Sequence, residues 1–180
     1  MCMFERRLLS AAVAAFAGLA GAAAQEGPGL GVPATPEQVA GWDISVGPDG
    51  VGLPPGSGTA AAGKVVYEAK CVACHGVDGA GRPNDQLVGG QGTLREAAPI
   101  RTIGSYWPYA TTVFDYVRRA MPYVTPHTLT ADETYAVTAY LLALNGVIEQ
   151  DAVMDAATLP KVVMPNRASF DSAYREPRRR

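Results

Sequence analysis

Two cysteines and a histidine fall within five residues, in the run CVACH from Cys71 to His75. Two thiols at this spacing can add to the two vinyl groups of a haem, and the adjacent imidazole can bind its iron. The same cysteine spacing occurs in redox dithiols and in zinc sites. Neither accounts for a histidine directly after the second cysteine, and a zinc site needs further ligands where only His127 remains. The motif therefore predicts one haem, held covalently by Cys71 and Cys74 and ligated by His75.

The first 24 residues have the three parts of a secretory signal peptide. A charged start at Arg6 and Arg7 precedes an apolar run over residues 8–20, and small residues follow up to Ala24. We expect cleavage after Ala24, although an uncleaved anchor is the alternative. The run is shorter than the roughly 20 residues of a spanning helix, and no later stretch approaches that length, so we expect no membrane span. Haem attachment of this kind occurs outside the cytoplasm, which places the mature chain in the periplasm.

The charge of the mature chain argues against a nucleic-acid partner. Residues 1–24 contain two arginines and one glutamate, which leaves 15 − 2 = 13 basic and 17 − 1 = 16 acidic residues, a net charge of about −3. Of the three cysteines, Cys2 lies in the predicted signal peptide. Cys71 and Cys74 are therefore the thiols that the mature chain keeps.

Glycine, proline and helical periodicity divide the rest of the chain. Residues 25–56 are rich in Gly and Pro and predict an extended arm or a disordered linker. Helices are expected over residues 59–69, 108–120 and 131–145, the last with a capping box at Thr130 and Glu133, and one helical turn over residues 94–97. These elements predict one domain over residues 57–147, followed by an irregular tail, residues 148–180, that ends in arginines: Arg175, Arg178, Arg179 and Arg180.

The second axial ligand of the iron is predicted to be Met121. It lies 121 − 75 = 46 residues after the histidine, just past an amphipathic helix, and Pro122 would hold its loop. Met154, Met164 and His127 are the other candidates in the mature chain. Ligation by His75 and Met121 saturates the iron and leaves no open position for a substrate, which favours electron transfer over bond chemistry.

Other residues are candidates for a supporting role around the haem. The turn at Pro83 could supply the carbonyl that accepts from the second ring nitrogen of His75. Arg101 could pair with haem propionates, and aromatic side chains just before the helix that leads to Met121 could cover the haem edge or pack in the core: Tyr106, Trp107 and Tyr109. Gly63 and Tyr67 on the first helix, with Tyr140 on the last, predict a close crossing of the terminal helices.

The helix before CVACH, the Gly-rich loop, Met121 and the terminal helix together resemble class I cytochromes c over about residues 57–147. This resemblance is most specific at Cys71, Cys74, His75 and Met121. It implies an all-α fold of three to four helices around one haem, with the arm and the tail as extensions.

A narrower resemblance covers nearly the whole mature chain. Four stretches are similar to the cytochrome subunits of Sox sulfane dehydrogenases and of related molybdenum sulfite dehydrogenases: WDISVGPDGVGLPPGSG, TIGSYWPYATTVFDYVRRAMP, LTADETYAVTAYLLALNG and LPKVVMPNRASF. Such subunits take electrons from a molybdenum-cofactor subunit that oxidises sulfite or sulfane sulfur. These cytochrome subunits pass the electrons to a small soluble cytochrome c or an oxidase. The Sox subunit typically has two haem domains, whereas this sequence has one CVACH run.

The resemblance therefore implies an electron-transfer subunit whose arm and tail embrace the catalytic subunit. Two other functions stay open from the residues alone. A haem enzyme acting on a sulfur compound would need an exchangeable or cysteine sixth ligand, and a haem-based sensor would need an open or weakly bound position at the iron.

Overall fold

The computed structural model of the chain describes residues 29–170. The predicted signal peptide, residues 1–24, and the arginines of residues 171–180 lie outside the described residues. The chain divides into two compact units, residues 1–39 and 40–180. Helix α2 (Pro36–Trp42) crosses this boundary and buries none of its side chains. Of the helices within residues 29–170, none is long and apolar enough to cross a membrane.

Two of the long helices begin at residues whose side chains cap them, and the sequence predicted the second of these caps. The hydroxyl of Thr59 accepts from the N–H of Ala62 at the start of α3 (Ala60–Lys70). In α6 (Ala131–Leu144), Thr130 and Glu133 form a reciprocal capping box, in which each side chain accepts from the backbone N–H of the other residue. Both helices are therefore confirmed to within one residue of the predicted bounds.

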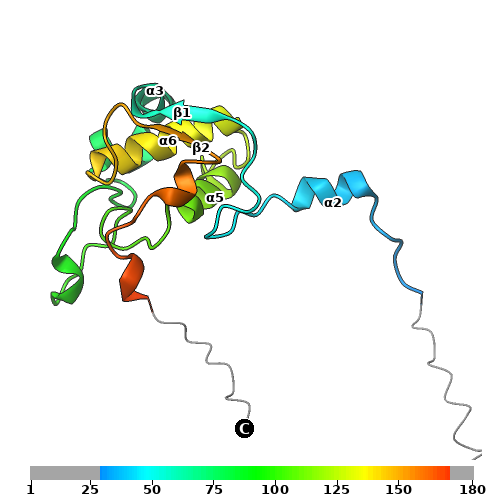
Figure 1. Ribbon diagram of the computed structural model, residues 1–180, viewed down its shortest axis with the longest axis horizontal. Helices are drawn as coiled ribbons and strands as arrows, with labels where there is room; N and C mark the ends of the chain where they lie inside the picture. Colours follow the sequence, from blue (N-terminus) through cyan, green and yellow to red (C-terminus); the bar gives the residue numbers. More distant parts are fainter. Residues whose placement is uncertain (1–28, 171–180) are drawn as a thin grey trace, which may run out of the picture. The chain divides into compact units, whose positions relative to one another are not determined.

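Helices α3 and α6 cross closely, with α3 behind α6 in Figure 1. Gly63 is the point of nearest approach, because a Cβ atom there would collide with the backbone carbonyl of Ala136. One turn later the rings of Tyr67 and Tyr140 pack at 5.4 Å between centroids. The predicted crossing of the terminal helices is confirmed.

Helix α5 (Ala110–Ala120) presents an apolar face to the core. Val113 and Phe114 are almost fully buried, and the Phe114 ring lies 4.5 Å from the ring of Tyr135 on α6. The helix ends at Met121, whose N–H donates to the carbonyl of Val117. The arrangement follows the predicted amphipathic pattern.

The C-terminal segment, which the sequence predicted as an irregular tail, returns to the core and contains three short elements. Strand β2 (Val153–Asp155) pairs antiparallel with β1 (Ser57–Thr59), and the two run side by side in Figure 1. The 3₁₀ turns η3 (Leu159–Lys161) and η4 (Arg167–Ser169) follow. Met154, Leu159 and Met164 belong to the same buried apolar cluster as α5 and α6.

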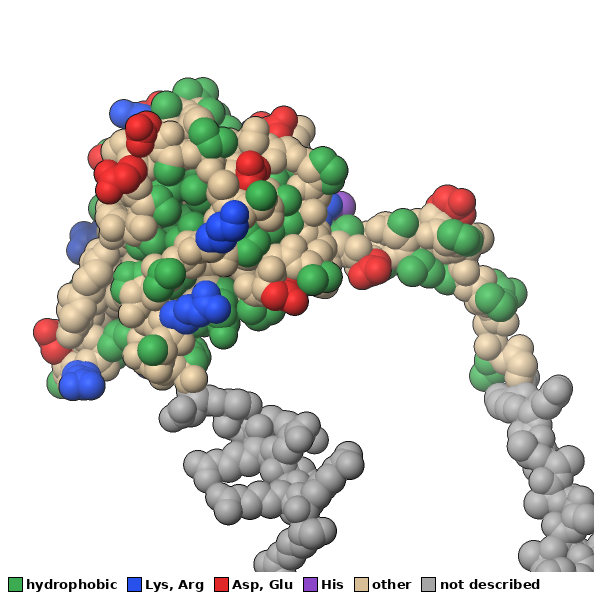
Figure 2. All heavy atoms as spheres, viewed as in Figure 1, with side chains coloured by type: hydrophobic (Ala, Val, Ile, Leu, Met, Phe, Trp, Pro, Cys, Tyr) green, Lys and Arg blue, Asp and Glu red, His purple; other side chains and the backbone are tan. Residues whose placement is uncertain are grey.

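Between α3 and α5 the chain is mostly loop. It contains α4 (Val72–His75), η1 (Val77–Gly79) and η2 (Thr93–Arg95), the last where one helical turn was expected. The structure is thus mostly helical with one small sheet, which confirms the all-α fold class. On the face shown in Figure 2, acidic and basic side chains are interspersed with apolar ones.

Candidate haem-binding site

The short helix α4 presents the two thiols and the imidazole of the motif. The N–H of Cys71 donates to the carbonyl of Tyr67 and so ends α3, and α4 begins at the next residue. Cys71 is half-buried and Cys74 is exposed, and both thiols are free. Burial raises the pKa of Cys71 to about 11, against a smaller lowering by Lys70. The Cys71 thiol is therefore protonated at neutral pH.

His75 is oriented by a backbone carbonyl. Its Nδ1 atom lies 2.9 Å from the carbonyl oxygen of Asp85. Because a carbonyl oxygen can only accept, Nδ1 carries the proton and Nε2 keeps its lone pair for a metal. The sequence placed this acceptor at Pro83, and the structure corrects it to Asp85, two residues later. Pro83 itself is exposed on the turn that leads there.

The loop after His75 folds back onto α4 and satisfies its carbonyls. The N–H of Gly81 donates to the carbonyl of His75 at 2.7 Å, and that of Asn84 donates to Cys74 at 2.9 Å. Gly76 begins this turn with a φ of 73°, and a side chain there would collide with the carbonyl of Gly81. The loop therefore fixes the helix end that carries the histidine.

The crossing helices hold the same loop from the other side. The hydroxyl of Tyr67 donates to the carbonyl of Gly76 at 2.8 Å, and that of Tyr140 donates to Oδ1 of Asp78 at 2.7 Å. Burial first, and then the Asp78 carboxylate, raise the pKa of Tyr140 well above its ordinary value. The tyrosines thus link the packing of α3 and α6 to the position of His75.

Burial separates Met121 from the other candidates for the second axial ligand. Met154 and Met164 are 5 % and 1 % exposed and lie within the apolar core, where they fill space. Met121 is half-buried at the C-terminal end of α5, and His127 is exposed. Met121 is therefore the thioether best placed outside the core cluster.

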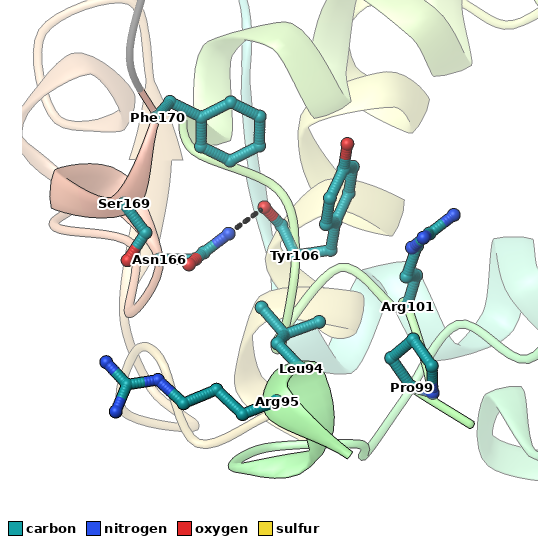
Figure 3. Close-up of a pocket in the computed structure, with 8 residues that line it drawn as sticks. All are labelled: Leu94, Arg95, Pro99, Arg101, Tyr106, Asn166, Ser169 and Phe170. Carbon is teal, nitrogen blue, oxygen red and sulfur yellow. Dashed lines mark hydrogen bonds between the residues drawn. The ribbon is translucent and has the colours of Figure 1, made fainter. Parts of the chain in front are cut away.

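Arg101 and Tyr106 lie together at a cavity of about 530 Å³ between η2 and η4 (Figure 3). The guanidinium of Arg101 is 5.7 Å from the centre of the Tyr106 ring. From the tail, the Asn166 amide donates to the carbonyl of Tyr106 at 2.8 Å, and the Phe170 ring packs edge-on against Tyr106 at 5.3 Å. The tail thus contributes a wall of this cavity, which the sequence did not predict.

The other two aromatic candidates are held outside this cavity lining. Trp107 is half-buried and packs edge-on against Tyr116, with 5.8 Å between ring centroids. Tyr109 is the residue that precedes α5, and the guanidinium of Arg167 lies 5.1 Å from the centre of its ring. Trp107 therefore packs against the middle of α5, and Tyr109 is held at its start.

Asn145 is a supporting residue that sequence reasoning missed. It is 9 % exposed at the end of α6, where its side chain accepts from the N–H of Gly89 and donates to the carbonyls of Leu87 and Leu141. An Asn before a Gly at a helix end is a recognisable C-terminal signal. Its reach to a loop more than 50 residues away has no local signature.

These donors fit a covalently bound haem. Two free thiols, an imidazole with an available Nε2 and a half-buried thioether are the groups that haem attachment and axial ligation require. Half-buried apolar side chains border the core on the same segments, among them Val72, Leu87 and Val117. Within residues 29–170 there is no group of three or more His, Cys, Asp or Glu side chains that could hold a metal ion.

Comparison with known proteins supports the same assignment. A family model described as cytochrome c matches residues 60–145. Among solved structures, a chain of the sulfane dehydrogenase SoxCD from Paracoccus pantotrophus is 46% identical, with a TM-score of 0.76 over 80% of this chain and 71% of that one. No curated protein matched. Together with the CVACH geometry, these likenesses show that the chain belongs to the cytochrome c family, whose members bind haem c covalently and serve electron transfer.

Proposed function

We propose that this protein is the electron-transfer subunit of a periplasmic dehydrogenase. The observation that carries the proposal is the fixed imidazole of His75, whose Nδ1 proton is engaged by Asp85 while Met121 stands outside the apolar core. A histidine and a methionine as axial ligands leave no iron position for a substrate. That arrangement suits electron transfer without bond making or breaking.

The protein's own residues need only hold and shield the redox group. Haem c, when bound, supplies the one-electron chemistry. Cys71 and Cys74 would tether it, and the Asp85 carbonyl keeps His75 in one tautomer and one orientation. Arg101, beside the Tyr106 ring, would offset the negative charge of the propionates.

The proposed electron donor is a molybdenum-cofactor subunit that oxidises sulfite or sulfane sulfur. The likeness to a chain of a sulfane dehydrogenase covers 80% of this chain, which is more than the residues 60–145 that match the general cytochrome c model. The similarity therefore includes segments outside the common haem-binding core. A small soluble cytochrome c or an oxidase would accept the electrons.

The proposal also sets the bounds of the mature protein. Cleavage after Ala24 would release it into the periplasm, with one haem in a domain over residues 57–147. Of the arm, residues 25–56, the exposed stretch 29–43 would then be available to the dehydrogenase, as would the exposed surface of the tail, residues 148–180. In the described part of the arm, Trp42 is 87 % exposed, as a contact residue for a partner would be.

The first experiment tests ligation. Purified ferric holoprotein is expected to show the near-infrared charge-transfer band of methionine sulfur bound to haem iron, and Met121→Ala is expected to lose it. Met154→Leu, a volume-conserving change in the core, serves as the control and keeps the band. The ferrous wild type should not bind carbon monoxide, whereas ferrous Met121→Ala should.

A wild type that lacks the band or binds carbon monoxide would overturn the carrier function in favour of a haem enzyme or sensor. The donor is tested separately by mixing oxidised holoprotein with a molybdenum sulfite or sulfane dehydrogenase subunit and its substrate. Rapid haem reduction is expected. If neither dehydrogenase subunit reduces the haem, molybdenum sulfite and sulfane dehydrogenases are excluded as electron donors.

A further inference from the structure

Residues 44–48, here called the strap, lie along one face of α5. The hydroxyl of Thr111 donates to the carbonyl of Pro48 at 3.1 Å, the N–H of Val46 donates to Oδ1 of Asp115 at 2.8 Å, and Arg118 donates to the carbonyl of Ile44 at 3.3 Å. Along these three contacts the residue number in the strap decreases, from 48 to 46 to 44, while the residue number in the helix increases, from 111 to 115 to 118. The strap therefore runs antiparallel to the helix.

The spacing of the two segments matches. Helix positions 111, 115 and 118 share one face, and seven residues of helix span about 10 Å at 1.5 Å each. Four residues of extended chain span about 13 Å. The strap thus reaches both turns of that face, and the opposite face carries the buried Val113.

The central contact is a buried, charge-assisted one. Asp115 is 8 % exposed, and both of its carboxylate oxygens also accept from the guanidinium of Arg119. Burial would raise the pKa of Asp115, but hydrogen bonds from Arg119 and Val46 outweigh it and lower that pKa. Val46 itself is 5 % exposed and belongs to the core cluster. The strap is therefore anchored by charge and by apolar burial together.

The strap acts on the end of the helix that carries Met121. Arg118 and Arg119 form the last turn of α5, and Met121 follows directly, with its N–H on the carbonyl of Val117. Arg118 donates directly to the strap, and Arg119 is linked to it through Asp115. The strap lies outside residues 60–145, so the common cytochrome c core does not supply this restraint.

We infer that Asp115 is a positioning residue for the second axial ligand, an inference that rests on the proposed function. The strap and Asp115 together hold Met121 against displacement from the iron. Loss of the anchor frees the last turn of α5 and raises the fraction of molecules in which the thioether is detached. An external ligand then binds more tightly, because apparent affinity scales with the competent fraction.

The test is imidazole binding to ferric holoprotein, followed by the visible spectrum at fixed pH. Asp115→Ala should bind imidazole about tenfold more tightly than the wild type, and Asp115→Asn, which keeps an acceptor for Val46, should fall between them. Asp115→Asn also keeps the test valid if the alanine variant does not fold. The near-infrared methionine band should weaken in the same order.

Asp132→Ala is the matched control. Asp132 on α6 likewise accepts a backbone N–H from the N-terminal segment, that of Ser57 at 2.7 Å, but α6 leads to no ligand. The imidazole affinity of Asp132→Ala should equal that of the wild type, even if its unfolding midpoint falls as far as that of the Asp115 variants. Equal affinities for wild type and Asp115 variants, or an equal shift in Asp132→Ala, would overturn the inference. If the wild type lacks the methionine band, Met121 is not the axial ligand, and this result overturns the proposed function rather than the inference about Asp115 alone.

Discussion

The crossing of α3 and α6 and the loop of residues 76–103, called the haem loop below, are stabilised in opposite ways. At the crossing, glycine and alanine bring two backbones together, and the tyrosine rings of positions 67 and 140 fill the space beside them. The haem loop has few buried apolar side chains. Its backbone is instead held by hydrogen bonds, some within the loop and others from side chains of distant elements, such as Asn145.

This difference separates folding from function within one small protein. Closely packed helices leave no room for an added atom. A loop held by hydrogen bonds keeps an exact backbone path only while each partner is present. The first region therefore sets stability, and the second sets where the ligand His75 points.

The largest effect is expected from breaking the crossing. Gly63→Ala adds a Cβ atom that collides with the Ala136 carbonyl, which is backbone and cannot move aside. We expect a loss of about 2–3 kcal/mol in the free energy of unfolding, because overpacking outweighs the gain in helix propensity. Denaturant titration measures it. Gly41→Ala in α2, where a Cβ atom meets nothing within 4 Å, should cost nothing, and equal losses would refute the steric account.

A smaller loss should follow from removing a polar anchor of the haem loop. Asn145→Ala leaves the Gly89 N–H without its partner, while the Leu87 carbonyl keeps the N–H of Ile103, and the expected cost is about 2 kcal/mol. Hydrogen exchange should speed up at Gly89 while amides in the middle of α6 stay protected. Exposed Asn84, whose backbone and not its side chain binds Cys74, is the control position. Uniform loss of protection in both regions would show that they are not separable.

The smallest effect tests Tyr140, whose ring belongs to the crossing and whose hydroxyl belongs to the haem loop. Tyr140→Phe keeps the ring and removes the bond to Asp78, so it should cost about 1 kcal/mol. The pKa of Tyr140 is raised above its ordinary value of 10.0, first by burial. The unfolded chain therefore loses this proton first, and stability falls as pH rises above about 10.

In Tyr140→Phe the part of the stability loss at alkaline pH that comes from the Tyr140 hydroxyl should disappear. Unfolding midpoints measured across the alkaline range compare the two proteins directly. An identical alkaline profile in both would mean that the hydroxyl is not held in the folded state.

Sequence reasoning succeeded where the signal is local. The capping box of α6 lies within four residues, and the apolar period of α5 within eleven, so both helices could be predicted closely. CVACH places all its chemistry in one helical turn. In each case the interacting groups are neighbours along the chain.

What it missed depends on partners far apart in sequence. Asp115 meets Val46 across 69 residues, and β1 meets β2 across nearly a hundred, with three-residue strands too short to carry a pattern. The acceptor for His75 was placed at Pro83 because a proline turn is visible in sequence, whereas the path of the next two residues is set by the folded loop. Burial of Met154 and Met164 follows from the same long-range return of the tail.

The pairing of β1 with β2 has one further consequence. Because the strands are antiparallel, Ser57 faces Asp155 at the separation of neighbouring strands, about 5 Å. Both strands lie outside residues 60–145, and the chain on the far side of each returns to the core, at Val46 before β1 and at Leu159 and Met164 after β2. The two extensions are thus joined by one backbone pairing, so shortening the chain at either end to the matched core would leave the strand at the other end with an unpaired edge.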